Sequence, residues 1–259
     1  MLNRNMAPIS DKVWEEIDER AKEVLKSYLT ARKVVKVKGP KGLDFNAVGE
    51  GRLEEIKEAD AIFYSNYAVK PLTEARVEFE LDRKELDNIV RGAKDPDLTP
   101  LEDAMKKLAL FEEKAVYYGL VDVSIEGLDK ASKKAIPFGK DRDSIVNSIA
   151  KGISQLREAY AAIPYALVVG EEEYKNIILN DNGYPLEKKI SKLIDGDIYV
   201  SKAVKGAFLV PFDSEDLELT IGQDFAIGFL EADDDKIKFF ATESFTFRVL
   251  DPNIVVKFE

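Results

Sequence analysis

Residues 217–258 constrain the fold of this chain more than any other stretch. In residues 245–249, phenylalanine and valine alternate with threonine and arginine, and this period of two is typical of a strand that buries one face. Residues 217–221 alternate in the same way, and three aspartates at 233–235 indicate a charged turn between two long strands. The stretch therefore predicts an antiparallel sheet with a hairpin, and it contains no catalytic motif.

The composition excludes whole classes of chemistry. The chain has 259 residues, which is enough for one large domain or two modest ones with a sizeable core. It contains neither cysteine nor histidine. Disulfides, thiolate or imidazole metal ligands, cysteine nucleophiles and histidine bases are therefore excluded. Carboxylates, lysine, tyrosine and serine remain as the side chains available for catalysis.

Net charge and hydropathy limit the partners and the location. The formal net charge is -11, which argues against a nucleic-acid partner and favours cations and basic peptides. No apolar run approaches the roughly 20 residues that a membrane-spanning helix needs. The first residues lack the apolar region of a signal peptide. We therefore expect a cytoplasmic protein with no membrane partner.

Helical and strand patterns alternate along the chain without a regular repeat. Ser10 is a candidate N-cap, and Thr99 to Glu102 has the pattern of a capping box with proline at the first helical position. The mixture predicts an α+β fold with a boundary near residue 122 and a return near 217. Helices are expected over residues 11–30, 99–118, 143–161, 171–179 and 186–194. Strands are expected over residues 34–38, 77–81, 165–169, 198–201, 207–211 and in the C-terminal stretch.

Residues 43–73 are irregular and contain Gly49-Glu50-Gly51. This Gly-x-Gly lacks a third glycine and a strand-to-helix turn, so it is not a nucleotide-binding loop. Two extended segments joined by a turn predict a long projecting hairpin. Because an isolated hairpin is marginally stable in water, we expect it to require another subunit.

Carboxylates are clustered, but no cluster has the spacing of a catalytic pair. Neighbours in sequence do not converge on one substrate atom in a helix, so solvated faces are the expected interpretation. Ser144 and Ser148 have no histidine to activate them. No catalytic or metal-binding residue is therefore predicted. The clusters are Glu54-Glu55, Glu112-Glu113, Glu171-Glu172-Glu173 and Asp233-Asp234-Asp235.

Several stretches, in order and at matching spacing along nearly the whole chain, resemble encapsulin shell proteins. No single one is diagnostic, but the series is specific. The stretches are Ile9-Ser-Asp-Lys-Val-Trp14-Glu-Glu-Ile-Asp18, Ala31-Arg32-Lys33-Val34 followed by Gly39-Pro40-Lys41-Gly42, Glu85-Leu-Asp-Asn-Ile-Val-Arg-Gly92, Tyr184-Pro-Leu-Glu-Lys188, Gly222-Gln-Asp-Phe-Ala-Ile-Gly228 and Thr242-Glu-Ser-Phe-Thr-Phe247.

The resemblance implies a Hong Kong 97 phage major-capsid-like fold with a P-domain, an A-domain and an extended E-loop. Copies of one subunit would close into a hollow icosahedral shell in the cytoplasm, with pores for ions and small molecules. Cargo enzymes, ferritin-like iron oxidases or peroxidases, would dock on the inner wall by C-terminal targeting peptides. The expected segments are 1–42 (N-terminal helix and strand of the P-domain), 43–75 (E-loop), 76–122 (P-domain with spine helix), 123–216 (A-domain) and 217–259 (P-domain return).

The resemblance also implies two sites. One is a loop at the A-domain tip that lines a five-fold pore, and the other is a groove for the cargo peptide. Some relatives bind flavin on an aromatic residue in the segment that is Asp82-Arg83-Lys84 here, so we predict no flavin and no other cofactor. Lys36 also replaces an acidic residue of some relatives. The pore-loop residues are Asn180, Asp181, Asn182 and Gly183. The groove residues are Leu25, Leu29, Arg32, Asp224, Ile227 and Phe229.

Two alternatives to a cargo-enclosing shell protein remain at this point. A prophage-type major capsid protein would have the same fold. A carboxylate-dependent enzyme acting as a single subunit is a third class, but no paired acid and base supports it.

Overall fold

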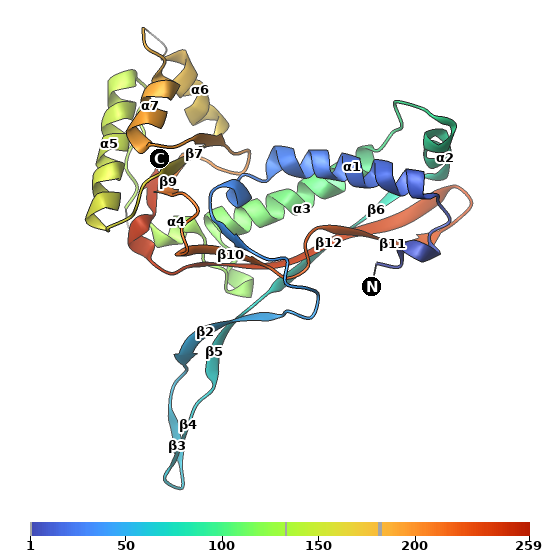
Figure 1. Ribbon diagram of the computed structural model, residues 1–259, viewed down its shortest axis with the longest axis horizontal. Helices are drawn as coiled ribbons and strands as arrows, with labels where there is room; N and C mark the ends of the chain where they lie inside the picture. Colours follow the sequence, from blue (N-terminus) through green and yellow to red (C-terminus); the bar gives the residue numbers. More distant parts are fainter. Residues whose placement is uncertain (1, 133, 181–182) are drawn as a thin grey trace.

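A computed structural model describes residues 2–259 except residues 133, 181 and 182. The molecule consists of an elongated body, a smaller lobe at one end of the body, and an arm that projects from it (Figure 1). The short helical turns are η1 (Arg4–Met6), η2 (Ala31–Lys33), η3 (Val121–Val123), α4 (Leu128–Ala131) and η4 (Pro252–Ile254).

The body is built on a sheet centred on the long strand β12 (Lys236–Val249). One edge of β12 pairs antiparallel with β11 (Ala226–Ala232) and then with β10 (Leu217–Ile221). Its other edge pairs with β6 (Thr73–Asp82), and β1 (Lys36–Lys38) runs parallel to β10. The predicted hairpin with its exposed aspartate turn at 233–235 is confirmed.

Two long helices, α1 (Asp11–Tyr28) and α3 (Thr99–Tyr118), lie side by side over this sheet (Figure 1). The shorter α2 (Arg83–Arg91) follows β6. The edge of the Trp14 ring meets Phe239, with the ring centroids 5.5 Å apart, and Phe79 stacks on Phe239 at 5.6 Å. Removal of this apolar surface from water is the main stabilising term of the body. Buried members of this core include Trp14, Ile17, Phe79, Leu81, Leu86, Leu98, Leu101, Met105, Phe229 and Phe239.

The start of α3 corrects one prediction. The helix begins at Thr99 as expected, but its N-cap is Leu98 and no capping box forms. The Asp97 carboxylate instead accepts a hydrogen bond from the Thr99 backbone N–H at 3.0 Å. Hydrogen bonds from Thr99 lower the pKa of Asp97. The carboxylate thus satisfies a donor that the first helical turn leaves free.

The smaller lobe contains a second sheet of the order β13–β9–β7–β8. Its strands are β7 (Tyr165–Val169), β8 (Ile198–Val200), β9 (Ala207–Pro211) and β13 (Val256–Phe258). Its helices are α5 (Arg142–Glu158), α6 (Glu171–Leu179) and α7 (Leu186–Ile194). Every residue of β7 and β9 is buried.

The last strand of the chain lies in the smaller lobe and not in the larger sheet. After β12 the chain turns through η4, where Asp251 accepts from the Asn253 N–H, and β13 then pairs with β9 in the smaller lobe. Phe258 is fully buried there, edge-on to Phe138. Burial of this aromatic ring explains why the chain leaves the larger sheet.

The arm is formed by two successive two-stranded ribbons. β2 (Ala47–Leu53) pairs with β5 (Tyr67–Pro71), and β3 (Lys57–Ala59) pairs with β4 (Ile62–Tyr64). It extends away from the body (Figure 1), which confirms the predicted projecting hairpin. Its apolar side chains are exposed. They are Leu53, Ile56, Ile62, Phe63, Tyr64, Tyr67 and Val69.

Candidate functional site

A groove of about 390 Å³ lies between α1, the start of β11 and the first residues of the chain. Five of the six residues expected to contact a cargo peptide line it, and the sequence patterns did not indicate the others. The expected residues are Leu25, Leu29, Arg32, Asp224 and Ile227. The additional lining residues are Leu2, Arg4, Asp18, Ala21, Lys22, Met105, Phe225 and Ala226.

Phe229 is not among the residues that line this groove. Its side chain is 8% exposed and belongs to the core beneath the helices. Its backbone takes part instead, since the Phe229 N–H donates to the carbonyl oxygen of Leu2 at 2.8 Å. Phe229 shares a strand face with Ile227, since residues two apart on a strand point to the same side, but only Ile227, nearer the start of β11, reaches the groove.

Arg32 forms one end of the groove, and carboxylates of the same chain hold it on several sides. Its Nε and Nη2 donate to the carboxylate of Glu112 at 2.8 and 2.6 Å, and Nη1 donates to Asp224 at 2.7 Å. The guanidinium also lies 4.6 Å from the centre of the Phe225 ring. Burial opposes its charge, but the hydrogen bond and charge of Glu112 raise the pKa of Arg32 above its ordinary value. Arg32 is therefore a fixed brace between η2, α3 and the start of β11.

The carboxylates behind Arg32 overturn the expectation that Glu112 and Glu113 lie on a solvated face. Both are fully buried, as is Glu243 of β12. The reason is that α3 packs against the cores of both the body and the smaller lobe, so this part of the helix has no solvent-exposed face. Burial and the neighbouring charge of Glu112 raise the pKa of Glu243 well above its ordinary value. Burial thus favours the neutral form of Glu243, while Arg32 forms an ion pair with Glu112.

Glu113 joins the end of α1 to the smaller lobe. Its carboxylate accepts from the backbone N–H groups of Thr30 and Ala31 at 2.8 and 2.7 Å, and from Ser201 Oγ at 3.0 Å. Burial raises the pKa of Glu113 to about 7, although hydrogen bonds from Thr30, Ala31 and Ser201 oppose the shift. This buried acid therefore positions the turn that carries Arg32.

The predicted pore loop lies between α6 and α7 at the outer end of the smaller lobe. Asn180 and Gly183 are described, whereas Asp181 and Asn182 lie outside the described residues. Arg142, at the start of α5, donates to the carbonyl oxygens of Asn180 and Tyr184, at 3.2 and 2.8 Å. One guanidinium thus holds both sides of the loop. No sequence pattern had indicated this role for Arg142.

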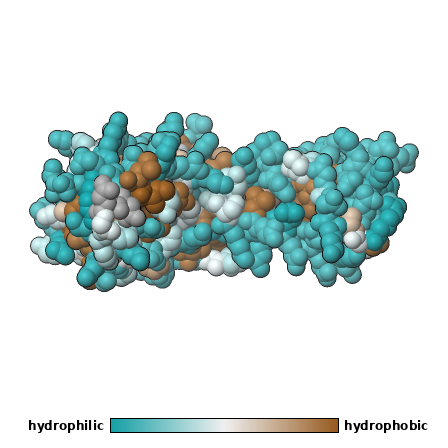
Figure 2. Space-filling model, turned by 90° about the horizontal axis from the view of Figure 1, so that it is seen from above, coloured by the Kyte–Doolittle hydropathy of each residue, from teal (hydrophilic) through white to brown (hydrophobic). Residues whose placement is uncertain are grey.

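The end of α6 that leads into this loop exposes apolar side chains. Ile178 and Leu179 are 49% and 71% exposed. Figure 2 shows an apolar patch at this end of a mostly hydrophilic face. Single exposed apolar side chains are common on soluble proteins, whereas large contiguous apolar patches are typical of contact sites.

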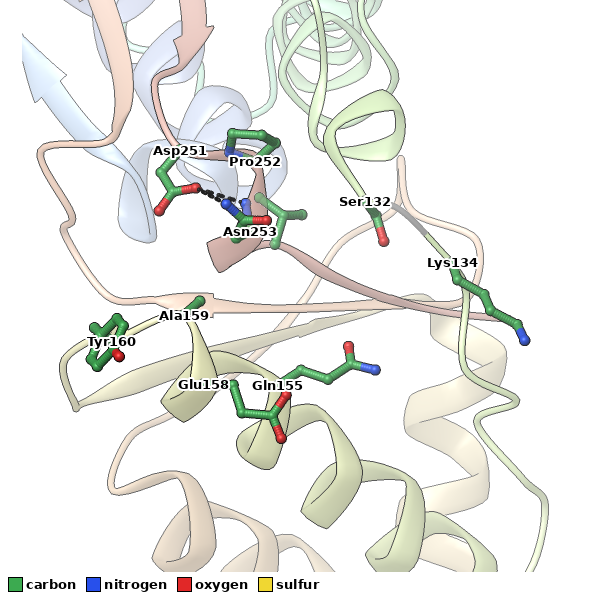
Figure 3. Close-up of a pocket in the computed structure, with 10 residues that line it drawn as sticks. Ser132, Lys134, Gln155, Glu158, Ala159, Tyr160, Asp251, Pro252 and Asn253 are labelled. Atoms are coloured by element: carbon green, nitrogen blue, oxygen red, sulfur yellow. Dashed lines mark hydrogen bonds between the residues drawn. The ribbon is translucent and has the colours of Figure 1, made fainter.

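A second pocket, of about 490 Å³, lies between the end of α5 and η4 (Figure 3). Lys134 and Tyr160 lie at opposite ends of it, and the Asp251 carboxylate is occupied by hydrogen bonds from Asn253. Among the described residues that line it, no hydrogen bond joins a nucleophile to a base. Its lining residues are Ser132, Lys134, Gln155, Glu158, Ala159, Tyr160, Asp251, Pro252, Asn253 and Val255.

Comparison with known structures defines the class of this fold. The virus-like particle from Pyrococcus furiosus superposes with a TM-score of 0.69 over 95% of this chain and 98% of that chain, at 15% identity. The capsid of Myoviridae phage XM1 superposes with a TM-score of 0.60 over 89% of this chain and 91% of that chain, at 13% identity. The fold is thus that of the Hong Kong 97-like capsid proteins.

Sequence comparison then identifies the family. Residues 1–246 match the family described as encapsulating protein for peroxidase. The type 1 encapsulin shell protein of Mycobacterium tuberculosis is 35% identical over 249 residues, which cover 95% of this chain and 94% of the relative. The chain belongs to the encapsulin shell protein family. It is a structural protein rather than an enzyme. No helix in the described part of the chain has the length and apolar character needed to cross a membrane.

Proposed function

We propose that copies of this chain assemble in the cytoplasm into a hollow icosahedral shell that encloses a peroxidase or a ferritin-like iron oxidase. The cargo is held by its C-terminal peptide in the groove under α1. Membership of the encapsulating family supports the enclosure of a peroxidase, and the capsid-like fold supports the closed shell. Loops at residues 180–183 surround pores that pass ions and small molecules.

The arm supports assembly from identical copies. Phe63 and Tyr67 are 70% and 77% exposed, and the ribbons of the arm have too few strands to bury these side chains themselves. An extended apolar ribbon of this kind is a hazard for aggregation unless a partner covers it. Contacts between unlike surfaces of identical subunits close into a finite shell when the rotation between neighbours closes.

The groove supports docking of an extended apolar peptide. Its floor is formed by the aliphatic residues Leu25, Leu29 and Ile227, and Asp224 lies at its polar end next to Arg32. β11 is an edge strand of the sheet, so its outer edge is the side to which an extended peptide adds, and there the Phe229 N–H donates to Leu2. Strand addition supplies affinity through the backbone, and apolar pockets supply specificity.

The sequence match over nearly the full length of the chain is the observation that favours an encapsulin shell protein over a prophage capsid protein. Encapsulin shell proteins match at 35% identity, whereas the phage capsid XM1 shares the fold at only 13% identity. The purified chain should therefore elute as a particle of megadalton size and appear as a closed shell by electron microscopy. Particles that contain phage-like DNA instead of protein cargo would favour the capsid alternative.

A cargo-loading experiment tests whether the groove binds the C-terminal peptide of the cargo. The chain is co-expressed with fluorescent proteins that end in the C-terminal peptides of peroxidases and ferritin-like proteins from the same organism. One such fusion should co-purify with the shells, and Leu25→Glu should abolish its loading while shells still form. Ser27→Glu is the matched control, because Ser27 is exposed on the same helix and does not line the groove. Equal loading of both variants would refute the assignment of the groove.

A further inference from the structure

The first described residues of the chain form part of the wall of the proposed cargo groove. Leu2 and Arg4 line the same space as Leu25 and Ile227, and the chain enters it along the outer edge of β11 (Figure 1). The Leu2 carbonyl oxygen accepts from Phe229 N–H at 2.8 Å. We call residues 2–6 the N-terminal strap.

The strap is held by few contacts. Besides the Leu2 hydrogen bond, Arg4 pairs with Asp18 of α1 at 2.6 Å, and its guanidinium lies 4.0 Å from the centre of the Trp14 ring. The side chains of Arg4 and Asp18 are 35% and 48% exposed, so water weakens this ion pair. No residue of η1 is buried, and the turn has no side-chain cap.

One polar atom of the strap is also poorly satisfied. Arg4 Nε is buried and has no hydrogen-bond partner in the part of the chain that the structure describes. A buried donor without an acceptor disfavours the conformation that contains it. The strap therefore lines the groove without the complete hydrogen bonding that holds the Arg32 guanidinium.

Strap and cargo compete for the same edge. A peptide that adds to β11 needs the backbone groups of its outer edge, and Leu2 already takes the N–H of Phe229. A peptide that reaches from Ile227 to Phe229 would overlap the backbone of Leu2, which lies next to Gly228. Both cannot occupy this edge at once.

We infer that the N-terminal strap is an internal occupant of the groove, and that the cargo peptide displaces it when it docks. The inference rests on the proposed function of the groove. Displacement lowers the apparent affinity for cargo by the fraction of subunits whose groove is open. Weakening the strap should accordingly raise apparent affinity, by roughly tenfold if about one groove in ten is open in the natural chain.

The first experiment measures loading of the tagged fluorescent protein that enters wild-type shells, at limiting expression of that protein. The variants are Arg4→Ala, which removes the ion pair, and a deletion of residues 2–6. Arg20→Ala is the control, because Arg20 also lies in an exposed ion pair of α1 but does not line the groove. Both strap variants should load more cargo than the control. Lower loading by intact Arg4→Ala shells would show that the strap is a fixed wall.

The second experiment follows hydrogen exchange and needs no cargo to report on the strap. In empty shells, Arg4→Ala should speed exchange of the Phe229 amide, while Arg20→Ala should leave it unchanged. In loaded wild-type shells, the amides of Met6 and Ala7, which donate to Asn3 and Arg4, should exchange faster than in empty shells. Unchanged protection of these amides on loading would overturn the inference while leaving the groove intact. If no tagged protein enters wild-type shells, the proposed function fails, and the inference fails with it.

Discussion

The surroundings of Arg32, just after α1, and the projecting arm differ in where their exposed or polar groups find partners. Around Arg32, the guanidinium and the Ala31 N–H find acceptors within the chain on Glu112, Asp224 and Glu113, although Glu243 Oε1 has no partner among the described residues. In the arm, Phe63 and Tyr67 remain exposed and the ribbons keep free edges. The body is thus a folding unit that stabilises itself, whereas the arm is an interface that a second copy must complete.

The largest expected effect follows from replacing the arm's aromatic residues. Phe63→Asp combined with Tyr67→Asp should abolish shell assembly, because a charge at each site makes burial against a neighbour unfavourable. The free energy of unfolding of the subunit should change by less than about 0.5 kcal/mol, since both sites are exposed. Size-exclusion chromatography with light scattering measures the assembly, and circular dichroism measures the fold.

The control for the arm is Phe63→Tyr combined with Tyr67→Phe, which preserves aromatic bulk and should assemble normally. If the aspartate variant formed shells of ordinary size, the claim that the arm is an assembly interface, unlike the body, would be wrong. The assembly-deficient variant is also the useful background for the stability measurements below, because association otherwise adds to apparent stability.

The second largest effect is expected in the core of the body. Phe239 is fully buried between Trp14 and Phe79, so Phe239→Ala removes contacts to both rings and leaves a cavity. Such truncations cost about 3–5 kcal/mol. Urea unfolding in the assembly-deficient background measures the loss, and Phe240→Ala is the neighbouring comparison on the opposite face of β12. A cost below about 1 kcal/mol would mean that the body, like the arm, depends on a partner.

The third prediction concerns pH and Glu113. Its pKa is raised from 4.5 to about 7 by burial, so the folded state binds this proton more tightly than the unfolded state does. Relative to Glu113→Gln, the wild-type chain should be most stable at and below pH 4.5. It should lose stability as pH rises to 7, by up to roughly 3 kcal/mol, and change no further above that.

The difference between wild type and Glu113→Gln isolates this titration from the other carboxylates. The amide still accepts from the Thr30 and Ala31 N–H groups, which both point to Oε1. Glu113→Ala should be less stable than Glu113→Gln at every pH, because it leaves two buried N–H groups unpaired. Parallel pH profiles for wild type and Glu113→Gln would contradict the assignment of the raised pKa.

Local patterns predicted much of the fold. Five elements form at the expected residues: the helices 99–118, 171–179 and 186–194 and the strands 165–169 and 207–211. Their signals, which are apolar periodicity and flanking glycine, proline or asparagine, lie within a short stretch of sequence. The arm was also predicted from two extended segments around a turn. These features depend on near neighbours alone.

The candidate site was predictable only in part, because its interactions join distant positions. Arg32 meets Glu112 across 80 residues, Asp224 across 192 and Glu243 across 211. No pattern within one helix distinguishes a buried Glu112 from a solvated one. The strap is a further example, since no local sequence pattern predicts the hydrogen bond from the Phe229 N–H to the Leu2 carbonyl oxygen. Five groove residues were found only through the resemblance to encapsulin shell proteins.

The smallest effect is expected at the start of α3 and tests whether its N-terminus is held as the structure shows. Asp97→Ala removes the acceptor of the Thr99 N–H and should cost about 1 kcal/mol, whereas Thr99→Ala should cost less because no capping box forms. Asp97→Asn should recover most of the loss, since an amide oxygen still accepts. Neither change should affect assembly, because this helix end belongs to the self-sufficient body. If Thr99→Ala proves the more harmful, the capping box exists in solution and the helix begins as its sequence first indicated.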